Sequence, residues 1–281
     1  MTTKTQTLPI EPRFPWPESG TSKVARRGPM PDWVISTIAV VGLLLLWAVT
    51  TESGLIPSGY LPSPSEMIEE FGVLMKRGYK AVPLYEHVGI SLYRTAVGFF
   101  LGAAVGVPLG LLTGSSRILG AVVSPVMAFL RPIPPIAFIP MAVLYFGLGE
   151  SGKIALIFWT SAIYVHVNAH AGAANVPIGY SRAARSLGLK KTQYFLKVLL
   201  PAAIPQIFTG LKVAMSLAWA VVVAAELTGA QRGLGYMIAD AALVSRIPVV
   251  FIGIVLIGLV GLCLHSAIGL IESKLVHWKG R

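Results

Sequence analysis

Cysteine and charged residues are scarce in this sequence, and each shortage excludes a class of protein. The 281 residues include a single cysteine, Cys263, which lies inside an apolar run. An intrachain disulfide and a cysteine metal cluster are therefore excluded. Charged residues make up 12% of the chain and hydrophobic residues 54%, and several apolar runs approach the ~20 residues needed to cross a bilayer. This composition predicts a polytopic membrane protein and not a soluble one.

Acidic residues are the scarcer of the two charged classes. The chain has 12 Asp and Glu against 23 Lys and Arg, which gives a formal net charge of +11. Such an excess can indicate a nucleic-acid partner, but here the basic residues are scattered over the segments between apolar runs. Basic residues in such segments usually record membrane orientation. We therefore expect no nucleic-acid partner.

Six apolar windows predict membrane-spanning helices, because lipid leaves backbone groups no partner outside the segment. They lie at 33–51, 91–113, 128–147, 153–172, 203–228 and 248–271. The expected fold class is therefore an all-α polytopic membrane protein with about six transmembrane helices. Residues 1–32 hold six prolines and are expected to form a disordered cytoplasmic tail, followed by a membrane domain over 33–279.

The distribution of basic residues predicts that both termini are cytoplasmic. With the N-terminus inside, the inner segments are the tail, 114–127, 173–202 and the C-terminal end. The inner segments then carry Lys4, Arg13, Lys23, Arg26, Arg27, Arg117, Arg182, Arg185, Lys190, Lys191, Lys197, Lys274, Lys279 and Arg281. The outer segments carry Lys76, Arg77, Lys80, Lys153, Arg232 and Arg246. The excess on the inner side follows the positive-inside rule.

Between the first two spans, the stretch SPSEMIEEF predicts a short amphipathic helix on the outer surface. Ser63 and Glu66 have the spacing of a capping box, and Pro64 suits the first helical position. Ile68 and Leu74 fall on one face together with Phe71.

Glycine recurs at every fourth residue of the second span. The residues are Gly98, Gly102, Gly106, Gly110 and Gly114. This ridge has no side chains and allows another helix to approach closely, either as a fixed contact or as a groove along which helices slide during transport. Pro108 in the same span predicts a bend.

Four prolines interrupt the third span. Pro132, Pro134, Pro135 and Pro140 remove four backbone donors within nine residues, so a regular helix cannot pass undisturbed. Broken backbone at membrane depth usually lines a cavity or is buried in protein, and Arg131 adds a charge at the break. The proline break and Arg131 together predict a segment that lines the transport pathway. The alternative is that the Arg131 side chain extends to the inner membrane interface.

Two patterns that mimic catalytic motifs fail on inspection. GLGESGKI, residues 147–154, satisfies GxGxxG and GxxxxGK, but Ile154 replaces the hydroxyl that would hold magnesium and no strand precedes the motif. We expect a tight outer turn there. His166 and His170 are one helical turn apart, but no third metal ligand is evident, so polar packing is expected. With no catalytic constellation remaining, we expect no enzyme.

The segment from Pro177 to Pro201 predicts two short helices on the cytoplasmic side. Pro177 suits a helix start and Gly188 suits the left-handed position at a helix end. Pro201 is expected to open the next span. Ala183 and Ala184 would offer a small-residue surface among basic residues, which fits docking into another protein or a solvated loop equally well.

This segment resembles the EAA loop of permease subunits of bacterial ABC importers. The pattern of that loop is E-A-A, three residues, G, nine residues, I-x-L-P, and the matching residues here are Ala183, Ala184, Gly188, Val198, Leu200 and Pro201. Arg182 stands at the position of the glutamate and Val198 at that of the isoleucine. The first departure removes any contact that needs an acid at that position.

The resemblance extends over about residues 33–279. It includes the stretches LPSPSEM, RPIPPIAFIPMAVLYFGLGESGKI, RAARSLGLKKTQYFLKVLLPAAIPQIFTGLK and VVAAELTGAQRGLGYMI. These are similar to the nitrate, sulfonate, taurine and bicarbonate branch of the family, and to its taurine permeases above all. The resemblance implies a type I ABC importer permease fold in the bacterial inner membrane.

The same resemblance implies the partners. Two permease chains, expected to be identical, would assemble with two ATPase subunits and an external solute-binding protein. ATP and magnesium would bind to the ATPase subunits, and this chain would bind no cofactor or metal. Residues 177–191 would form the coupling helix, with contacts from Arg182, Ala183, Ala184, Arg185, Ser186, Leu187, Gly188 and Leu189.

The cargo expected from the resemblance is a small anion, taurine or another sulfonate, with nitrate, bicarbonate or another small organic anion as alternatives. Candidate pathway residues are Arg131, Pro132, Pro134, Pro135, Trp219 and Glu226. Arg131 is the expected attraction point for an anion, whereas Glu226 could also cap a loop or pair with Arg232.

A self-contained secondary transporter is the alternative class. It predicts an inverted repeat and buried acids for ion coupling, but no repeat is evident and Glu226 is the only acid well inside an apolar run. A membrane scaffold without transport would leave the proline break and the docking loop unexplained.

Overall fold

The computed structural model describes residues 31–276. The chain divides into two compact units, residues 1–47 and residues 48–281. The first unit contains most of α1 (Asp32–Glu52), which at 21 residues is long enough to cross a bilayer. The predicted disordered tail, residues 1–32, lies outside the described residues except for its last two positions.

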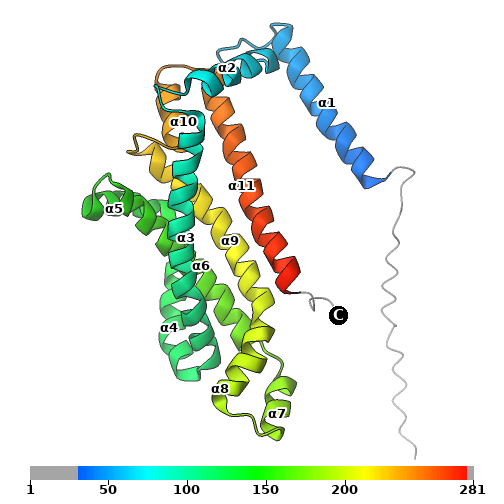
Figure 1. Cartoon of the computed structure of the whole chain (residues 1–281), viewed down its shortest axis with the longest axis vertical. Helices are drawn as coiled ribbons and strands as arrows, with labels where there is room; N and C mark the ends of the chain where they lie inside the picture. The colour runs from blue at the N-terminus through cyan, green and yellow to red at the C-terminus, as the bar shows by residue number, and fades with distance from the viewer. Residues whose placement is uncertain (1–30, 277–281) are drawn as a thin grey trace, which may run out of the picture. The chain divides into compact units, whose positions relative to one another are not determined.

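The described residues form an all-helical membrane fold, as predicted (Figure 1). Five of their helices are long and apolar enough to cross a membrane, and the number rises to six if one bent helix pair is counted as a single span. The five are α1, α3 (Leu84–Ser115), α6 (Glu150–Ala174), α9 (Leu200–Leu227) with the helical turns before it, and α11 (Ile247–Leu275). Because polar residues precede its apolar part, α3 begins earlier than the predicted span at residue 91.

The glycine ridge of α3 packs against α6, which confirms the predicted close helix contact. A Cβ added to Gly102 would lie 2.7 Å from the Phe158 carbonyl oxygen, and one added to Gly110 would lie 2.6 Å from the His166 carbonyl oxygen. Gly98, Gly106 and Gly114 meet α6 in the same way. Side chains at these positions would force the two helices apart. The sliding of helices along this groove stays a prediction.

The predicted third span is broken at its prolines. α4 (Arg117–Leu130) is followed by a 3-10 helix, η1 (Pro135–Phe138), and by α5 (Ile139–Phe146), and the two halves meet at 86°. The missing N–H groups of consecutive prolines explain the break, as expected.

The prediction that residues 114–127 connect two spans was wrong, because α4 occupies most of them. Ser116 caps this helix, since its side-chain oxygen accepts a hydrogen bond from the Leu119 N–H at 3.4 Å. Arg117 is the only charged residue of the segment, and the apolar residues after it favour a helix at a membrane.

Three short elements lead into α9. They are α7 (Ile178–Ser186), α8 (Lys191–Tyr194) and a π-helix, η2 (Phe195–Leu199). Pro201 lies in the first turn of α9, as expected, but α9 continues from η2, so the helical stretch runs without interruption from Lys191 to Leu227. The π-turn before Pro201 shifts the hydrogen-bond register, so the helix passes the missing N–H without ending.

The main buried core lies where α9 and α11 meet α10 (Leu234–Leu243). Trp219, Val222, Leu234, Met237 and Val249 are each at most 6% exposed. α10 was not predicted, because its ten residues extend only about 15 Å and cannot cross a membrane alone.

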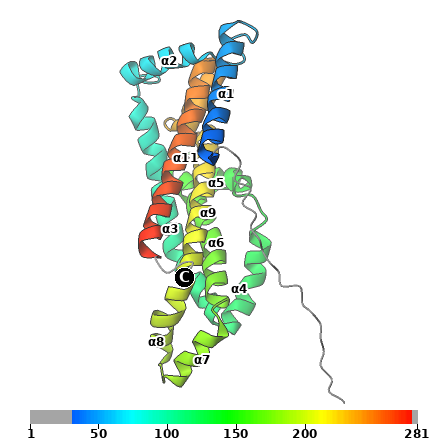
Figure 2. The same cartoon turned by 90° about the vertical axis from the view of Figure 1, so that its right-hand side faces the viewer.

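The predicted amphipathic helix is α2 (Pro64–Arg77), and it begins with the expected capping box. The Ser63 hydroxyl accepts a hydrogen bond from the Glu66 N–H at 3.3 Å, and the Glu66 carboxylate accepts one from the Ser63 N–H at 3.0 Å. α2 lies across the direction of α3 and α11, at the end of the bundle opposite α7 (Figures 1 and 2).

Candidate functional site

The predicted docking segment forms a short helix with a defined end. α7 starts after Pro177 and ends before Gly188, whose φ of 68° is left-handed as predicted. The Gly188 N–H donates to the Arg185 carbonyl at 3.0 Å, and the Leu189 N–H donates to the Ala184 carbonyl at 3.1 Å. These two bonds form a Schellman motif, which fixes the turn toward α8.

One side of α7 is anchored and the other is open. Ala184 is 4% exposed, and the Ser181 hydroxyl lies 2.8 Å from that of Tyr194. The expectation that Ala184 offers a small surface was therefore wrong, because packing onto the adjoining helix buries its methyl group. The open side carries three exposed apolar residues and the two arginines of the segment: Ile178, Tyr180, Leu187, Arg182 and Arg185.

Of the remaining predicted docking residues, Ala183, Ser186 and Gly188 are exposed and Leu189 is half-buried. A Cβ on Gly188 would meet nothing within 4 Å, so only its backbone conformation favours glycine.

Four of the predicted pathway residues lie at the break between α4 and η1. The side chains of Arg131, Pro132 and Pro134 are exposed and that of Pro135 is half-buried. The Arg131 side chain forms no ion pair within residues 31–276. Its carbonyl oxygen lies 3.5 Å from the hydroxyl of Tyr164 on α6.

The other two predicted pathway residues, Trp219 and Glu226, lie inside the protein. Trp219 is 6% exposed, and its indole N–H donates to the Ile257 carbonyl on α11 at 3.0 Å. Glu226 is 1% exposed. Neither side chain reaches an open surface of this chain, so the structure does not bring them together with Arg131.

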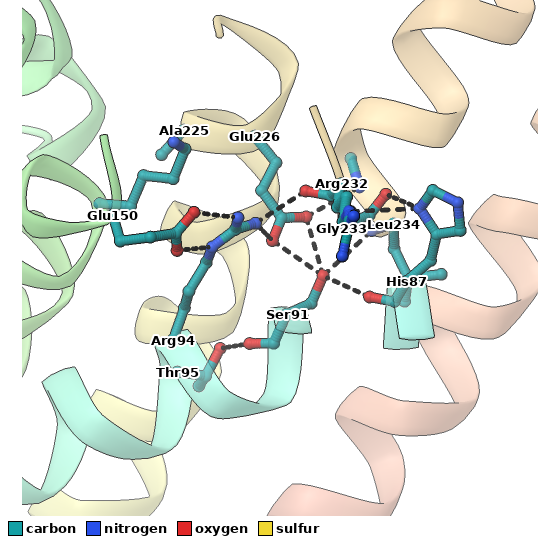
Figure 3. A network of polar contacts seen from close by, with 12 residues as sticks. His87, Ser91, Arg94, Thr95, Glu150, Ala225, Glu226, Arg232, Gly233 and Leu234 are labelled. Atoms are coloured by element: carbon teal, nitrogen blue, oxygen red, sulfur yellow. Dashed lines mark hydrogen bonds and ion pairs between the residues drawn. The ribbon is translucent and has the colours of Figure 1, made fainter. Parts of the chain in front are cut away.

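Glu226 belongs to a buried cluster of charges that joins three helices (Figure 3). Arg94 of α3 donates from Nη1 to the Glu226 carboxylate at 2.6 Å and to the Arg232 carbonyl at 2.9 Å. Its Nε and Nη2 donate to both oxygens of Glu150, at the start of α6, at 2.5 and 2.6 Å. Arg94 is 2% exposed, and these bonds use four of the five N–H donors of its guanidinium group.

Both oxygens of Glu226 accept further hydrogen bonds. Ser91 donates its hydroxyl to the carboxylate at 2.8 Å, and the Gly235 N–H donates at 3.0 Å. Ser91 in turn accepts a hydrogen bond from the Leu234 N–H at 3.0 Å. The predicted alternative that Glu226 pairs with Arg232 is therefore wrong, because Glu226 forms its ion pair with Arg94.

Two glycines make room for this cluster. A Cβ on Gly233, whose φ is 125°, would collide with the Glu226 carboxylate, and one on Gly235 would lie 2.5 Å from the Val223 carbonyl oxygen. His87, which is fully buried, lies with Nδ1 3.1 Å from the Gly233 carbonyl oxygen. The loop between α9 and α10 is thus held against α3.

The false nucleotide motif GLGESGKI is a tight turn, as predicted. Gly147 has a φ of 72°, and α6 starts at Glu150. The Lys153 amine donates to the carbonyls of Leu148 and Gly149 at 2.7 and 3.1 Å. Glu150 and Lys153 therefore close the turn and connect it to Arg94.

The histidine pair of α6 packs against Thr113, in line with the expected polar role. The Thr113 hydroxyl lies 3.1 Å from Nε2 of His166 and 2.9 Å from Nδ1 of His170. Within residues 31–276 no group of three potential metal ligands occurs.

Sequence reasoning missed Arg94 and Lys212, two cations inside apolar spans. Lys212 of α9 pairs with Glu272 of α11. An ionisable residue in a span is a functional candidate, and that signal was present for both. For Arg94 a second signal existed, because His87, Ser91 and Arg94 are spaced i, i+4, i+7 and share one face of α3.

The chain is similar to permease proteins of transport systems in both a family model and individual relatives. Residues 106–277 match the family described as "Binding-protein-dependent transport system inner membrane component". The taurine transport system permease protein TauC of Escherichia coli is 34% identical over 88% of this chain and 89% of its own length. The putative aliphatic sulfonates transport permease protein SsuC of Bacillus subtilis is 35% identical over 88% of each chain.

The nitrate import permease protein NrtB of Synechocystis is 35% identical over 88% of this chain and 90% of its own. Among solved structures, the inward-facing MetNI methionine ABC transporter superposes with a TM-score of 0.61. That match has 23% identity and covers 68% of this chain and 95% of the other. It supports the fold.

Proposed function

Because this chain belongs to the family of inner-membrane components of binding-protein-dependent transport systems, we propose that it forms the translocation pathway of an ATP-driven importer. Two copies of this chain would assemble with two ATPase subunits, which bind ATP and magnesium, and with an external solute-binding protein. In this arrangement the chain performs no catalysis of its own. Both termini would be cytoplasmic, as the distribution of basic residues predicts.

The observation that supports coupling is the open side of α7. Exposed Ile178 shares one face with Arg182 and Arg185 at i, i+4, i+7 spacing, and an apolar anchor flanked by arginine is typical of protein interfaces. Exposed Tyr180 and Leu187 form a second apolar pair, at i, i+7, on another part of the open surface. A lipid-facing surface would not carry two arginines, and a solvated loop would not need three exposed apolar side chains. We therefore assign this side of α7 to the ATPase.

A rigid connection runs from α7 toward the membrane. The Schellman motif and the buried Ala184 fix α7 against the start of the next helix. From Lys191 to Leu227 that helical stretch continues for 37 residues, or about 55 Å. Closure of the ATPase pair on binding ATP would displace α7, and this stretch would carry the displacement into the membrane.

The cargo is proposed to be a small anion such as taurine or another sulfonate. The support is the named cargo of the relatives and the exposed Arg131 at the proline break, whose side chain has no ion-pair partner within the described residues. Guanidinium binds sulfonate, nitrate and carboxylate oxygens with two parallel N–H donors. Nitrate, bicarbonate and other small organic anions remain alternatives within this chemistry.

The coupling assignment is tested with Gly188→Val. A β-branched residue cannot adopt a φ of 68° without strain, so the turn after α7 should deform while the membrane helices stay folded. The matched control is Gly89→Val in α3, outside the docking segment, where an added Cβ meets nothing within 4 Å. We expect Gly188→Val to lose co-purification of the ATPase and ATP-driven uptake.

Uptake in proteoliposomes should retain most of its rate in the control. Unchanged ATPase binding and uptake in Gly188→Val would remove the coupling assignment. Uphill transport by the purified chain without an ATPase would remove the importer assignment itself.

For the cargo, Arg131→Ala should reduce uptake of the anion at least several-fold with the ATPase still bound, and an unchanged rate would remove Arg131 from the pathway.

A further inference from the structure

α2 has an apolar face that is wider than its contact with the rest of the protein. Met67 and Leu74 pack on the core, and Leu74 is fully buried. The adjoining arc of the helix carries Ile68, Phe71 and Met75, which are 74%, 40% and 62% exposed. Their i, i+3, i+7 spacing places them in one row, which residues 48–276 leave exposed.

The other side of α2 is polar. Ser65 and Glu69 are exposed there, and Lys76 and Arg77 occupy the last turn, also exposed. Glu70, on the flank opposite the apolar row, pairs with Arg246. Apart from Val73, which is 37% exposed on the polar side, the helix is divided lengthwise into an apolar and a charged half, the division that lies flat at a membrane surface.

Contacts with α11 place α2 at the level of the membrane interface. Arg246, the partner of Glu70, directly precedes α11. Residues 247–271 of α11 carry no charged side chain, and these 25 residues extend about 37 Å, more than the ~30 Å hydrocarbon core. The first turns of α11 therefore reach the headgroup region, and α2 is attached there.

The direction of α2 is also that expected of a helix in the headgroup region. Both views show it lying across α3 and α11 (Figures 1 and 2). The turn over residues 78–83 joins it directly to the spanning helix α3, so α2 cannot move far from the bilayer. Its exposed apolar row thus continues the lipid-facing surface of the spans.

We propose that α2 is an interfacial helix whose row of Ile68, Phe71 and Met75 inserts into the lipid leaflet at this end of the bundle. Lys76 and Arg77 then reach the lipid phosphates from the last turn. Lipid is the occupant, rather than a second protein, because the row lies at headgroup level beside helices that lipid already surrounds. The proposal does not depend on the cargo or on the docking of α7.

Quenching of a fluorescent label tests the proposal in the full chain. In a Cys263→Ser background, single cysteines replace Ile68, Phe71 or Met75 in the row and Ser65 or Glu69 on the polar side. All five positions are exposed, so the substitutions leave the core unchanged. Each variant is labelled with bimane and reconstituted in vesicles of phosphatidylethanolamine and phosphatidylglycerol, with or without dibrominated lipid.

Brominated lipid should quench the three row positions several-fold more than the two polar positions, and aqueous iodide should show the reverse order. Ile254→Cys on α11, where the native side chain is 53% exposed, provides the value for a lipid-facing position. Equal quenching on both sides of α2 would overturn the proposal. Protection of the row from both quenchers would mean that protein covers it, and would equally overturn the assignment to lipid.

Discussion

Removal of Arg94 should be among the most destabilising single changes in this chain. Arg94→Met leaves the Glu226 carboxylate, which is 1% exposed, without its countercharge, although Ser91 and the Gly235 N–H still donate to it. Breaking a buried ion pair by deleting one partner costs about 3–5 kcal/mol. Arg232→Met is the matched control, because the side chains of Arg232 and Glu86 are 56% and 37% exposed. It should cost no more than about 1 kcal/mol.

A charge-balanced double variant separates the charge effect from lost packing. Arg94→Met combined with Glu226→Gln removes both buried charges and keeps an acceptor for the Gly235 N–H. Glu150 also loses its partner, but its side chain is 51% exposed and water can solvate it. The double variant should therefore be more stable than Arg94→Met alone, with the difference reporting the coupling energy.

The free energy of unfolding is measured by denaturant titration in detergent micelles, with helix content and tryptophan emission as two signals. The four proteins to compare are the unmodified chain, the two single arginine variants and the double variant. If Arg94→Met lost no more stability than Arg232→Met, the buried cluster would not depend on Arg94. If the double variant were less stable than Arg94→Met, the uncompensated charge would not be the cause of the loss.

Two further predictions concern the helix contact and the turn before α3. Gly110→Leu should separate α3 from α6 and destabilise the chain by several kcal/mol, because the leucine side chain would enter the α6 backbone. The control Gly89→Leu, in the same helix, places its side chain in open space and should cost little stability. The same denaturant titration compares the two variants, and equal losses of stability would contradict the close contact between α3 and α6. The Asp240 carboxylate accepts hydrogen bonds from Lys80 at 2.8 Å and Tyr79 at 2.6 Å, which hold the pKa of Asp240 below its ordinary value. The ionised Asp240 carboxylate stabilises the fold at pH values above its ordinary pKa, and this stabilisation is lost as pH falls through the lowered pKa of the folded state. The free energy of unfolding should therefore decline below about pH 4. The Asp240→Asn variant should lack this pH-dependent contribution.

Features that depend on local backbone chemistry could be predicted from the sequence. Four prolines in nine residues forced a break, and the break is there. Gly188 at a helix end indicated a left-handed cap, and the Schellman motif provides it. Glycine at every fourth residue of α3 predicted a close helix contact, although the partner, α6, could not be named because spacing within one helix says nothing about its neighbour.

Features that depend on contacts between distant residues were missed. Arg94 and Glu226 are 132 residues apart, and only the packing of α3 against α9 brings them together. Residues 114–127 were assigned to a loop because hydropathy alone does not reveal that Ser116 starts a helix. The docking and pathway residues stay predictions, because their partners are other molecules.

The buried cluster has a consequence for how the proposed importer would move. Arg94 joins α3 to the start of α6 and to the end of α9, and α9 is the far end of the helical stretch that begins next to α7. Separating Arg94 from Glu226 would cost several kcal/mol, whereas turning the three helices together breaks none of these bonds. A displacement that enters at α7 should therefore rotate α3, α6 and α9 as one rigid group. In the proposed importer, the conformational change would then occur at weaker joints, of which the proline break between α4 and α5 is the clearest in the described part of the chain.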